Sequence, residues 1–201
     1  MDDHFILEID DILPEHACNE IIKRFESEPN KKQSRIGVGA DNNGGILDLS
    51  SRNSKEICIS DDPKWMNITK ILYEAIYKSM HTYGKEVAKK IQTIGENVDF
   101  QMQFLIDNIK DSGLVIQRVE KDSWFRWHHD CTYNNRILNI IIYLNTLDEA
   151  DGGRTEFIHG RKIFPKVGKI LIFPTTWTNI HSGSWVKNKY KYICTTSFFK
   201  Y

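Results

Sequence analysis

The first part of the chain spaces its hydrophobic residues as helices do. Residues 13–26 begin near a proline and carry apolar side chains on one face, which predicts a short amphipathic helix after a strand at residues 5–9. Residues 63–91 repeat the pattern over a longer stretch and predict one long helix or two shorter ones. Between these segments, residues 29–54 are rich in Asn, Gly and Ser, with GADNNGG at their centre, and indicate a loop.

The pattern changes after residue 99, where apolar residues come in short runs rich in β-branched and aromatic types. Turn-forming residues separate the runs at 111–113, 133–135, 150–153 and 182–184. Such spacing predicts an antiparallel sandwich or jelly roll. The predicted strands are FQMQFLI, SGLVIQRV, SWFRWH, RILNIIIYLN, TEFI, GKILIF and YKYICTTSFF.

Together these patterns predict an α+β protein whose N-terminal helices pack on one sheet of a β core. We find no repeat, low-complexity tract or linker. We therefore expect a single domain over residues 1–201, with a helical support at about 1–98 and the β core at about 99–201.

Charge changes the list of expected partners. The 201 residues contain 27 Lys and Arg and 27 Asp and Glu, so no large net field draws the chain to nucleic acid or to an anionic membrane surface. No apolar run is long enough to span a bilayer, and MDDHFILEID lacks the features of a signal peptide. We expect a cytoplasmic protein with neither nucleic-acid nor membrane partners.

The four cysteines do not suggest a disulfide framework or a zinc site. They are far apart and form no CxxC pair. We expect reduced and mostly buried thiols. The residues are Cys18, Cys58, Cys131 and Cys194.

A candidate metal site begins at His128 and Asp130. Residues two apart in extended backbone point to the same face, so this imidazole and carboxylate can reach one ion, whereas His129 points away. His181, which follows the GKILIFP strand and opens a turn before the last strand, is the best third ligand. Two His and one carboxylate with open positions suit Fe(II). A His-x-Asp pair alone is weak, because chance matches are common.

Lys191 stands on the last predicted strand, on the same face as Ile193, Thr195 and Ser197. A buried cation in such surroundings needs an anion, which the distal carboxylate of 2-oxoglutarate would supply. The alternative is an outward lysine on a solvated edge strand. The pattern alone leaves both open.

With these residues in view, the stretch from 117 to 199 resembles the double-stranded β-helix of iron(II)/2-oxoglutarate oxygenases, specifically the prolyl 4-hydroxylase-like branch. The N-terminal half is similar too, with a strand, a Pro-initiated helix containing Cys18, and Arg52-x-Ser54 where the family often carries an Arg-Ser pair. The matching motifs are His128-x-Asp130, Arg136 seven residues before Tyr143, Gly152-Gly153-x-Thr155-x-Phe157, the strand at 168–174, His181, and Lys191-Tyr192 ten residues after His181.

The resemblance implies a role for each matching residue. His128, Asp130 and His181 are expected to bind iron. Lys191 and Tyr143 would hold the distal carboxylate of 2-oxoglutarate, and Thr155 would line its pocket.

Substrate contacts are less firmly indicated. Arg136 resembles the Arg that faces the peptide in prolyl 4-hydroxylases, although a strand Arg with its head in water fits the pattern as well. Of the tryptophans that flank the predicted site, we name Trp177 as the candidate that stacks on substrate. The sequence departs from the family at Val119, where many relatives carry Tyr, and at Ser197, where many relatives carry Trp. Both departures put the identity of the substrate in doubt.

The resemblance implies an Fe(II)- and 2-oxoglutarate-dependent dioxygenase that uses O2, with ascorbate as an optional reductant, and releases succinate and CO2. The expected substrate is a peptidyl residue, with proline as the first candidate. The same chemistry on another amino-acid side chain or on a small molecule is the alternative. A non-catalytic β-helix that binds a metal or ligand is the rival from a different class. Oligomeric state is not indicated.

Overall fold

The computed structural model of the chain describes residues 1–2, 4–37, 45–92, 109–131 and 135–200. The strand predicted at 100–106, nearly all of the GADNNGG segment and most of the turn predicted at 133–135 lie outside these residues. Among the described residues, no helix is long and apolar enough to span a membrane.

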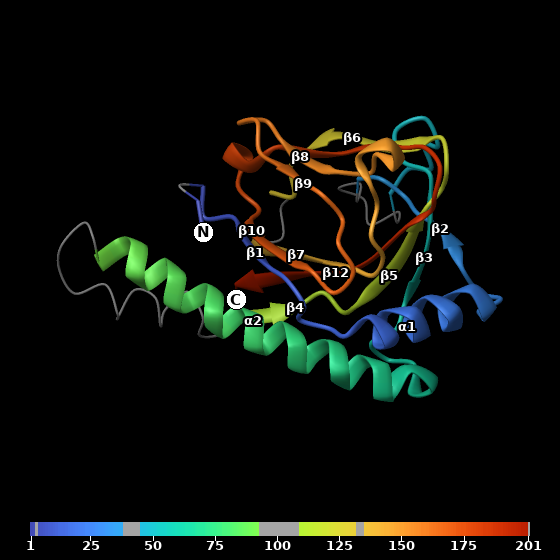
Figure 1. Cartoon of the computed structure of the whole chain (residues 1–201), viewed down its shortest axis with the longest axis horizontal. Coiled ribbons are helices and arrows are strands. Elements are labelled where there is room, and N and C mark those ends of the chain that lie inside the picture. The colour runs from blue at the N-terminus through green and yellow to red at the C-terminus, as the bar shows by residue number, and fades with distance from the viewer. Residues whose placement is uncertain (3, 38–44, 93–108, 132–134, 201) are drawn as a thin grey trace.

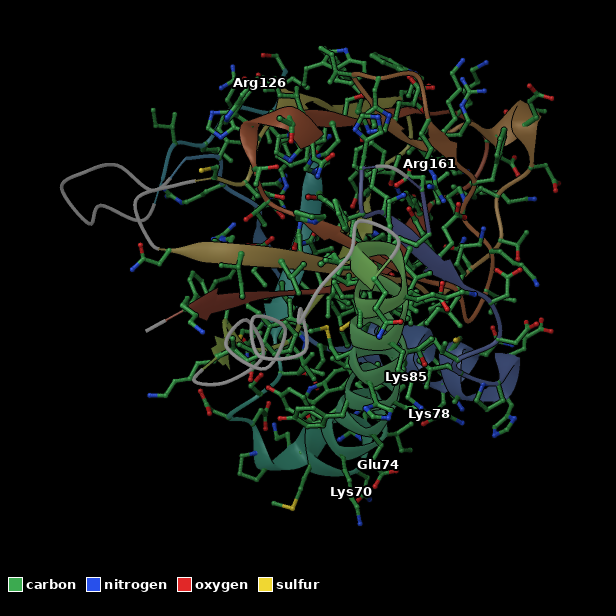
Figure 2. All side chains as sticks on the ribbon, turned by 90° about the vertical axis from the view of Figure 1, so that its left-hand side faces the viewer. Lys70, Glu74, Lys78, Lys85, Arg126 and Arg161 are labelled. Atoms are coloured by element: carbon green, nitrogen blue, oxygen red, sulfur yellow. The ribbon has the colours of Figure 1, made fainter. Side chains whose placement is uncertain are left out.

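The predicted helices are present. α1 spans Glu15–Ser27, and α2 spans Met66–Gln92 as one long helix, directly after the 3-10 turn η1 (Pro63–Trp65). The apolar face of α2 is buried, and polar residues occupy its other side, which Figure 2 shows turned away from the sheet. The outward residues are Lys70, Glu74, Lys78 and Lys85.

The strands form two sheets. The major sheet has the order β1-β10-β7-β12-β5-β3-β2, with β4 also paired to β12, and the minor sheet has the order β6-β11-β8-β9. The major strands are β1 (Leu7–Ile9), β2 (Lys32–Gln33), β3 (Ser54–Cys58), β4 (Ile109–Asp111), β5 (Val115–Val119), β7 (Arg136–Tyr143), β10 (Ile170–Pro174) and β12 (Lys191–Lys200). The minor strands are β6 (Ser123–His128), β8 (Thr155–Phe157), β9 (Lys162–Ile163) and β11 (His181–Val186).

From β5 onward the chain crosses repeatedly between the two sheets. β5, β7, β10 and β12 belong to the major sheet, and the intervening β6, β8 and β11 belong to the minor sheet. The sheets face each other, and α1 and α2 cover the far side of the major sheet (Figure 1). This is the predicted double-stranded β-helix with helices packed on one sheet.

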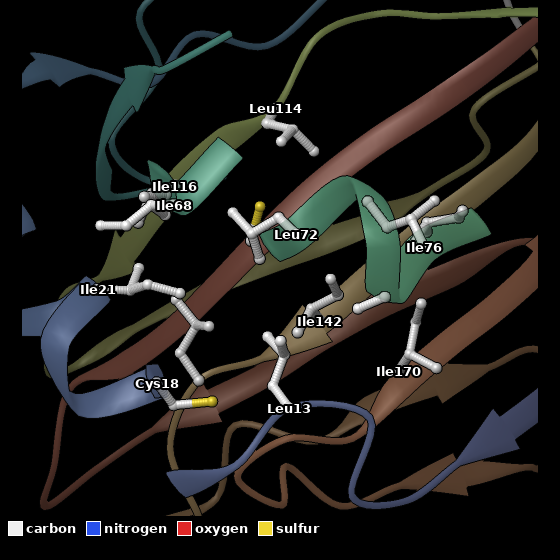
Figure 3. Packing of buried hydrophobic residues seen from close by; sticks show 14 of the residues in the cluster. Leu13, Cys18, Ile21, Ile68, Leu72, Ile76, Leu114, Ile116, Ile142 and Ile170 are labelled. Atoms are coloured by element: carbon white, nitrogen blue, oxygen red, sulfur yellow. The ribbon is translucent and has the colours of Figure 1, made fainter. Parts of the chain in front are cut away.

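The major sheet is buried on both faces, which explains why its central strands are almost continuously apolar. In β7, Ile140 and Ile142 pack toward the helices, whereas Ile141 and Tyr143 face the minor sheet. Figure 3 shows the helical side, where Ile142 lies near Leu72 and Leu13. From Asn139 onward, the odd-numbered residues of β7 therefore project into the space between the sheets, as do the odd-numbered residues of β12 from Lys191 to Ser197.

Two expectations are corrected. Residues 182–184 were predicted as a turn, but they lie inside β11, where Gly183 packs closely against Phe125 of β6. The N-terminal part supplies more strands than the one predicted at residues 5–9, because β2 lies inside the predicted loop, β3 begins at its end, and both join the major sheet.

The thiols are a third correction. Cys18 and Cys194 are buried as expected, but Cys58 and Cys131 are exposed. All four cysteines are free.

Candidate active site

A cavity of about 190 Å³ lies between the two sheets. Its walls combine apolar side chains with many polar and charged groups that converge on one space. The polar and charged residues that line it include Arg52, Gln117, His128, Asp130, Arg136, Asn139, Thr155, His181, Lys191, Thr195 and Ser197.

The three predicted metal ligands meet in this cavity. His128 ends β6 and His181 begins β11, and the two residues are directly paired across the minor sheet. Asp130 follows β6, with a carboxylate oxygen 3.5 Å from His181 Nε2 and the other 3.9 Å from His128 Nε2. One ligand atom from each residue lies within 4.8 Å of the others. The geometry therefore brings together the two imidazoles and one carboxylate that Fe(II) prefers.

Both imidazoles are held in the form that binds metal. The Nδ1 atom of His128 lies 2.8 Å from the carbonyl oxygen of Arg126, and that of His181 lies 3.0 Å from the carbonyl oxygen of Asn179. Because a carbonyl only accepts, each Nδ1 carries the proton and each Nε2 keeps its lone pair for a metal. Burial lowers the pKa of His128 and of His181, so both rings are neutral at pH 7.

The aromatic ring of Phe125 packs against one face of the His128 ring. Phe125 stacks on it with ring centroids 3.9 Å apart, and the Arg52 guanidinium lies 4.8 Å from the centre of the Phe125 ring. Arg52 also pairs with Glu56 at 3.3 Å. The cation, the phenyl ring and the imidazole therefore form one stack beside the predicted iron.

Lys191 lies deep in the cavity, and its surroundings match the buried-cation interpretation. Its side chain is buried, and its Nζ lies 5.4 Å from the centre of the Tyr143 ring. No carboxylate among the described residues pairs with it. Burial lowers the pKa of Lys191 to about 8. Lys191 is buried and β12 is paired on both sides, by β7 and β5, so the alternative of a solvated edge lysine is wrong. A ligand carboxylate would relieve the cost of burying this cation.

Tyr143 and Thr155 are joined to each other. The Tyr143 hydroxyl lies 2.7 Å from Thr155 Oγ1. Thr155 lines the cavity, whereas Tyr143 is fully buried behind it. Their expected contacts with 2-oxoglutarate remain predictions.

The paired glycines before Thr155 have a clear steric role. Gly152 and Gly153 have φ of 72° and 71°, in the left-handed region that favours glycine. A Cβ on Gly152 would lie 2.0 Å from the carbonyl oxygen of Trp185. The chain can therefore approach β11 closely here and lead Thr155 into the cavity.

The predicted substrate contacts differ in position. Arg136 lines the cavity, with Nη1 3.7 Å from Asp130 and its guanidinium 5.4 Å from the centre of the Phe199 ring. Trp177 lies in the 3-10 turn η3 (Trp177–Asn179) and is 72% exposed, outside the cavity lining. Val119 and Ser197, where the sequence departs from the family, both line the cavity.

Sequence reasoning assigned no role to Asn139 or Phe125, which contact Asp130 and His128 respectively. Asn139 could have been noticed as the polar residue that interrupts the apolar run of β7 on its cavity face. Phe125 carried no such signal.

The model of the 2OG-Fe(II) oxygenase superfamily matches residues 114–199, which contain the three predicted ligands and Lys191. Residues 114–199 belong to this superfamily. Fe(II) and 2-oxoglutarate are accordingly the cofactor and cosubstrate of this 2OG-Fe(II) oxygenase, and its two imidazoles and one carboxylate fit the iron. A comparison with curated protein sequences gave no match.

Solved structures share the fold of this oxygenase along nearly its full length. The viral collagen prolyl hydroxylase from Paramecium Bursaria Chlorella virus-1, solved as a 2OG complex, has a TM-score of 0.67 at 19% identity, covering 100% of this chain and 98% of its own. A prolyl hydroxylase from Trichoplax adhaerens, solved with a peptide fragment of hypoxia inducible factor, has a TM-score of 0.76 at 15% identity, covering 98% and 84%. A Pseudomonas putida prolyl-4-hydroxylase has a TM-score of 0.64 at 12% identity, covering 99% and 94%.

Proposed function

We propose that the chain hydroxylates a prolyl residue of a peptide or protein. One 2-oxoglutarate and one O2 are consumed, and the products are the hydroxylated residue, succinate and CO2. The observation that carries this proposal is the fold shared with prolyl hydroxylases along most of both chains, around a His-Asp-His group that could hold a metal ion.

In this proposal, the residues of the chain bind and orient the reactants. His128, Asp130 and His181 hold Fe(II), and Lys191 pairs with the distal carboxylate of 2-oxoglutarate, with Thr155 beside it. Bound Fe(II) and 2-oxoglutarate together supply the activation of O2 and the oxidation that transfers one oxygen atom to the substrate.

The remaining walls exclude water and receive the substrate. Ile141, Val186 and Ile193 form part of the apolar lining of the cavity. In this proposal, the cosubstrate and one substrate side chain occupy the cavity, and the rest of a peptide lies outside it. The guanidinium of Arg136 would then bind the peptide near the oxidised residue.

The same reaction on a different side chain or on a small molecule is the second candidate. It is favoured by Val119 and Ser197, because both departures from the family pattern line the cavity. A smaller residue at the position of Ser197 leaves room for a substrate group of another shape.

The test is mass spectrometry of paired peptides, identical except for Pro or Ala at one site, after incubation with Fe(II), 2-oxoglutarate and ascorbate. The proposal expects a gain of one oxygen in the Pro peptides only, with an equal amount of succinate. The His181→Ala chain serves as the control and should give neither product. Oxygen gained by another residue or by a free amino acid would favour the second candidate. A chain that forms no succinate with any substrate would favour the non-catalytic module.

A further inference from the structure

Asp130 differs from the other two metal ligands in its backbone support. β6 ends at His128, and Asp130 follows it in irregular backbone. Each imidazole is fixed by a carbonyl two residues earlier. The terminal torsion of a carboxylate is broad, so strand geometry does not set its direction here. Another contact must do so.

The side chain of Asn139 makes that contact. Its Nδ2 donates a hydrogen bond of 2.6 Å to Asp130 Oδ2, and its Oδ1 accepts from Ser197 Oγ at 3.1 Å and from the Ile140 N–H at 3.2 Å. A carboxylate only accepts, so the amide must turn its nitrogen toward Asp130. The Ser197 hydroxyl and the Ile140 amide favour the same orientation, because both donate to the oxygen.

The position of Asn139 makes it a rigid support. It lies in the middle of β7, opposite Phe173 of β10 on one side and opposite Ser197 of β12 on the other. Asn139 and Ser197 are therefore direct cross-strand neighbours on the cavity face of the major sheet. Because both residues are held in paired strands, their hydrogen bonds restrain the carboxylate of Asp130, which follows the end of β6.

The nearby guanidinium of Arg136 does not replace this bond. Arg136 Nη1 lies 3.7 Å from Asp130 Oδ1, which is too far for a hydrogen bond. Among the described residues, Asn139 makes the only hydrogen bond to this carboxylate. A hydrogen bond to a charged acceptor is also roughly twice as strong as a neutral one.

We propose that Asn139 and Ser197 act as a positioning pair for the iron ligand Asp130. Asn139 holds the carboxylate in the direction that the metal requires, and Ser197 holds the Asn139 amide in the orientation that donates. The inference rests on the iron site formed by His128, Asp130 and His181. It also gives Ser197, where the family pattern has Trp, a role in metal binding rather than in substrate binding alone.

The test is the affinity of the metal-free chain for Mn2+, used as a redox-stable stand-in for Fe2+ and followed by the electron paramagnetic resonance of free Mn2+. Loss of a residue that orients a metal ligand typically lowers metal affinity about tenfold to a hundredfold. We expect a loss of that size for Asn139→Leu, which keeps the branched shape of the side chain, and a loss of several-fold for Ser197→Ala. Ser197→Thr keeps the hydroxyl and should retain wild-type affinity.

Gln117→Leu is the matched control. Gln117 is another amide in the same cavity wall, but its Nε2 donates to Thr195 Oγ1 at 3.2 Å and not to a metal ligand. Its substitution should leave Mn2+ affinity unchanged. The double variant Asn139→Leu/Ser197→Ala should bind Mn2+ as Asn139→Leu alone does, because Ser197 acts only through Asn139.

A purely structural role gives different results. It predicts that Asn139→Leu unfolds at a lower urea concentration without metal but binds Mn2+ normally, and that outcome overturns the inference. A double variant whose loss of Mn2+ binding free energy equals the sum of the two single losses also overturns it. If Asn139→Leu does not fold, Asn139→Ala with Ser197→Ala provides the same cycle. A wild-type chain that binds no Mn2+ overturns the iron site and this inference together. A chain that binds Mn2+ as described but hydroxylates no peptide contradicts only the proposed substrate.

Discussion

Replacing Lys191 by methionine should stabilise the metal-free chain and weaken its binding of 2-oxoglutarate. Burial without a paired carboxylate lowers the pKa of Lys191 from 10.5 to about 8. At about 1.4 kcal/mol for each pH unit, keeping this lysine charged at pH 7 costs about 3 kcal/mol of folding free energy. Methionine has a similar length and carries no charge, so Lys191→Met should recover a large part of that cost.

The ligand should show the opposite effect. Removing one partner of a buried ion pair costs about 3–5 kcal/mol, which corresponds to at least a hundredfold loss of affinity. Urea unfolding of the metal-free chains measures the stability, and calorimetric titration of the Mn2+-loaded chains with 2-oxoglutarate measures the affinity. Lys187→Met is the control, because Lys187 is exposed on the preceding turn and should change neither quantity beyond about 0.5 kcal/mol.

The pH dependence of stability tests whether the charge on Lys191 destabilises the fold. A lysine with a lowered pKa destabilises the fold fully below pH 8, and the cost disappears as pH rises from about 8 toward 10.5. The stability advantage of Lys191→Met should therefore shrink over that range. A variant that is less stable than wild type at pH 7, or that binds 2-oxoglutarate normally, would refute the buried-cation account.

Further predictions concern pH, the ligand set and the paired glycines. The affinity of the metal-loaded wild type for 2-oxoglutarate should fall by up to about tenfold per pH unit above about pH 8, because Lys191 loses its proton. Calorimetric titration measures this affinity, and a constant affinity up to about pH 9.5 would contradict the prediction. His181→Ala should abolish both Mn2+ binding and succinate formation, whereas His129→Ala, an exposed neighbour of the ligands, should retain both. Gly152→Ala should destabilise the chain in urea by about 1–3 kcal/mol more than Gly160→Ala, because both positions have positive φ but only Gly152 would clash with the backbone; equal losses would show that the clash does not matter.

Local patterns predicted much of the fold because they report on burial. The helical spacing of residues 63–91 follows from one buried face of α2, and the alternation of Lys191, Ile193 and Thr195 follows from the face that β12 turns to the cavity. β3 was missed because its sequence, SKEIC, has little apolar content. It forms because β5 offers it a complete antiparallel register. Gly183 indicated a turn, although its lack of a side chain serves close packing against Phe125.

The metal site was only partly predictable for a physical reason. His128 and Asp130 are close in sequence, so their shared direction follows from local geometry. His181 reaches them through the pairing of β11 with β6, which the family pattern implied and periodicity did not. The bond from Asn139 to Asp130 depends on how irregular backbone after β6 lies over β7, and no local pattern encodes that contact.

The most direct test of the iron and 2-oxoglutarate site is an anaerobic titration of the Fe(II)-loaded chain with 2-oxoglutarate, followed by visible absorption. Chelation of Fe(II) by a 2-oxo acid gives a charge-transfer band. We expect this band to appear in the wild type and saturate at one 2-oxoglutarate per chain. It should be absent from His181→Ala, and Lys191→Met should require much higher concentrations to produce it. A wild-type chain without the band, or a His181→Ala chain that retains it, would contradict the assignment of the site.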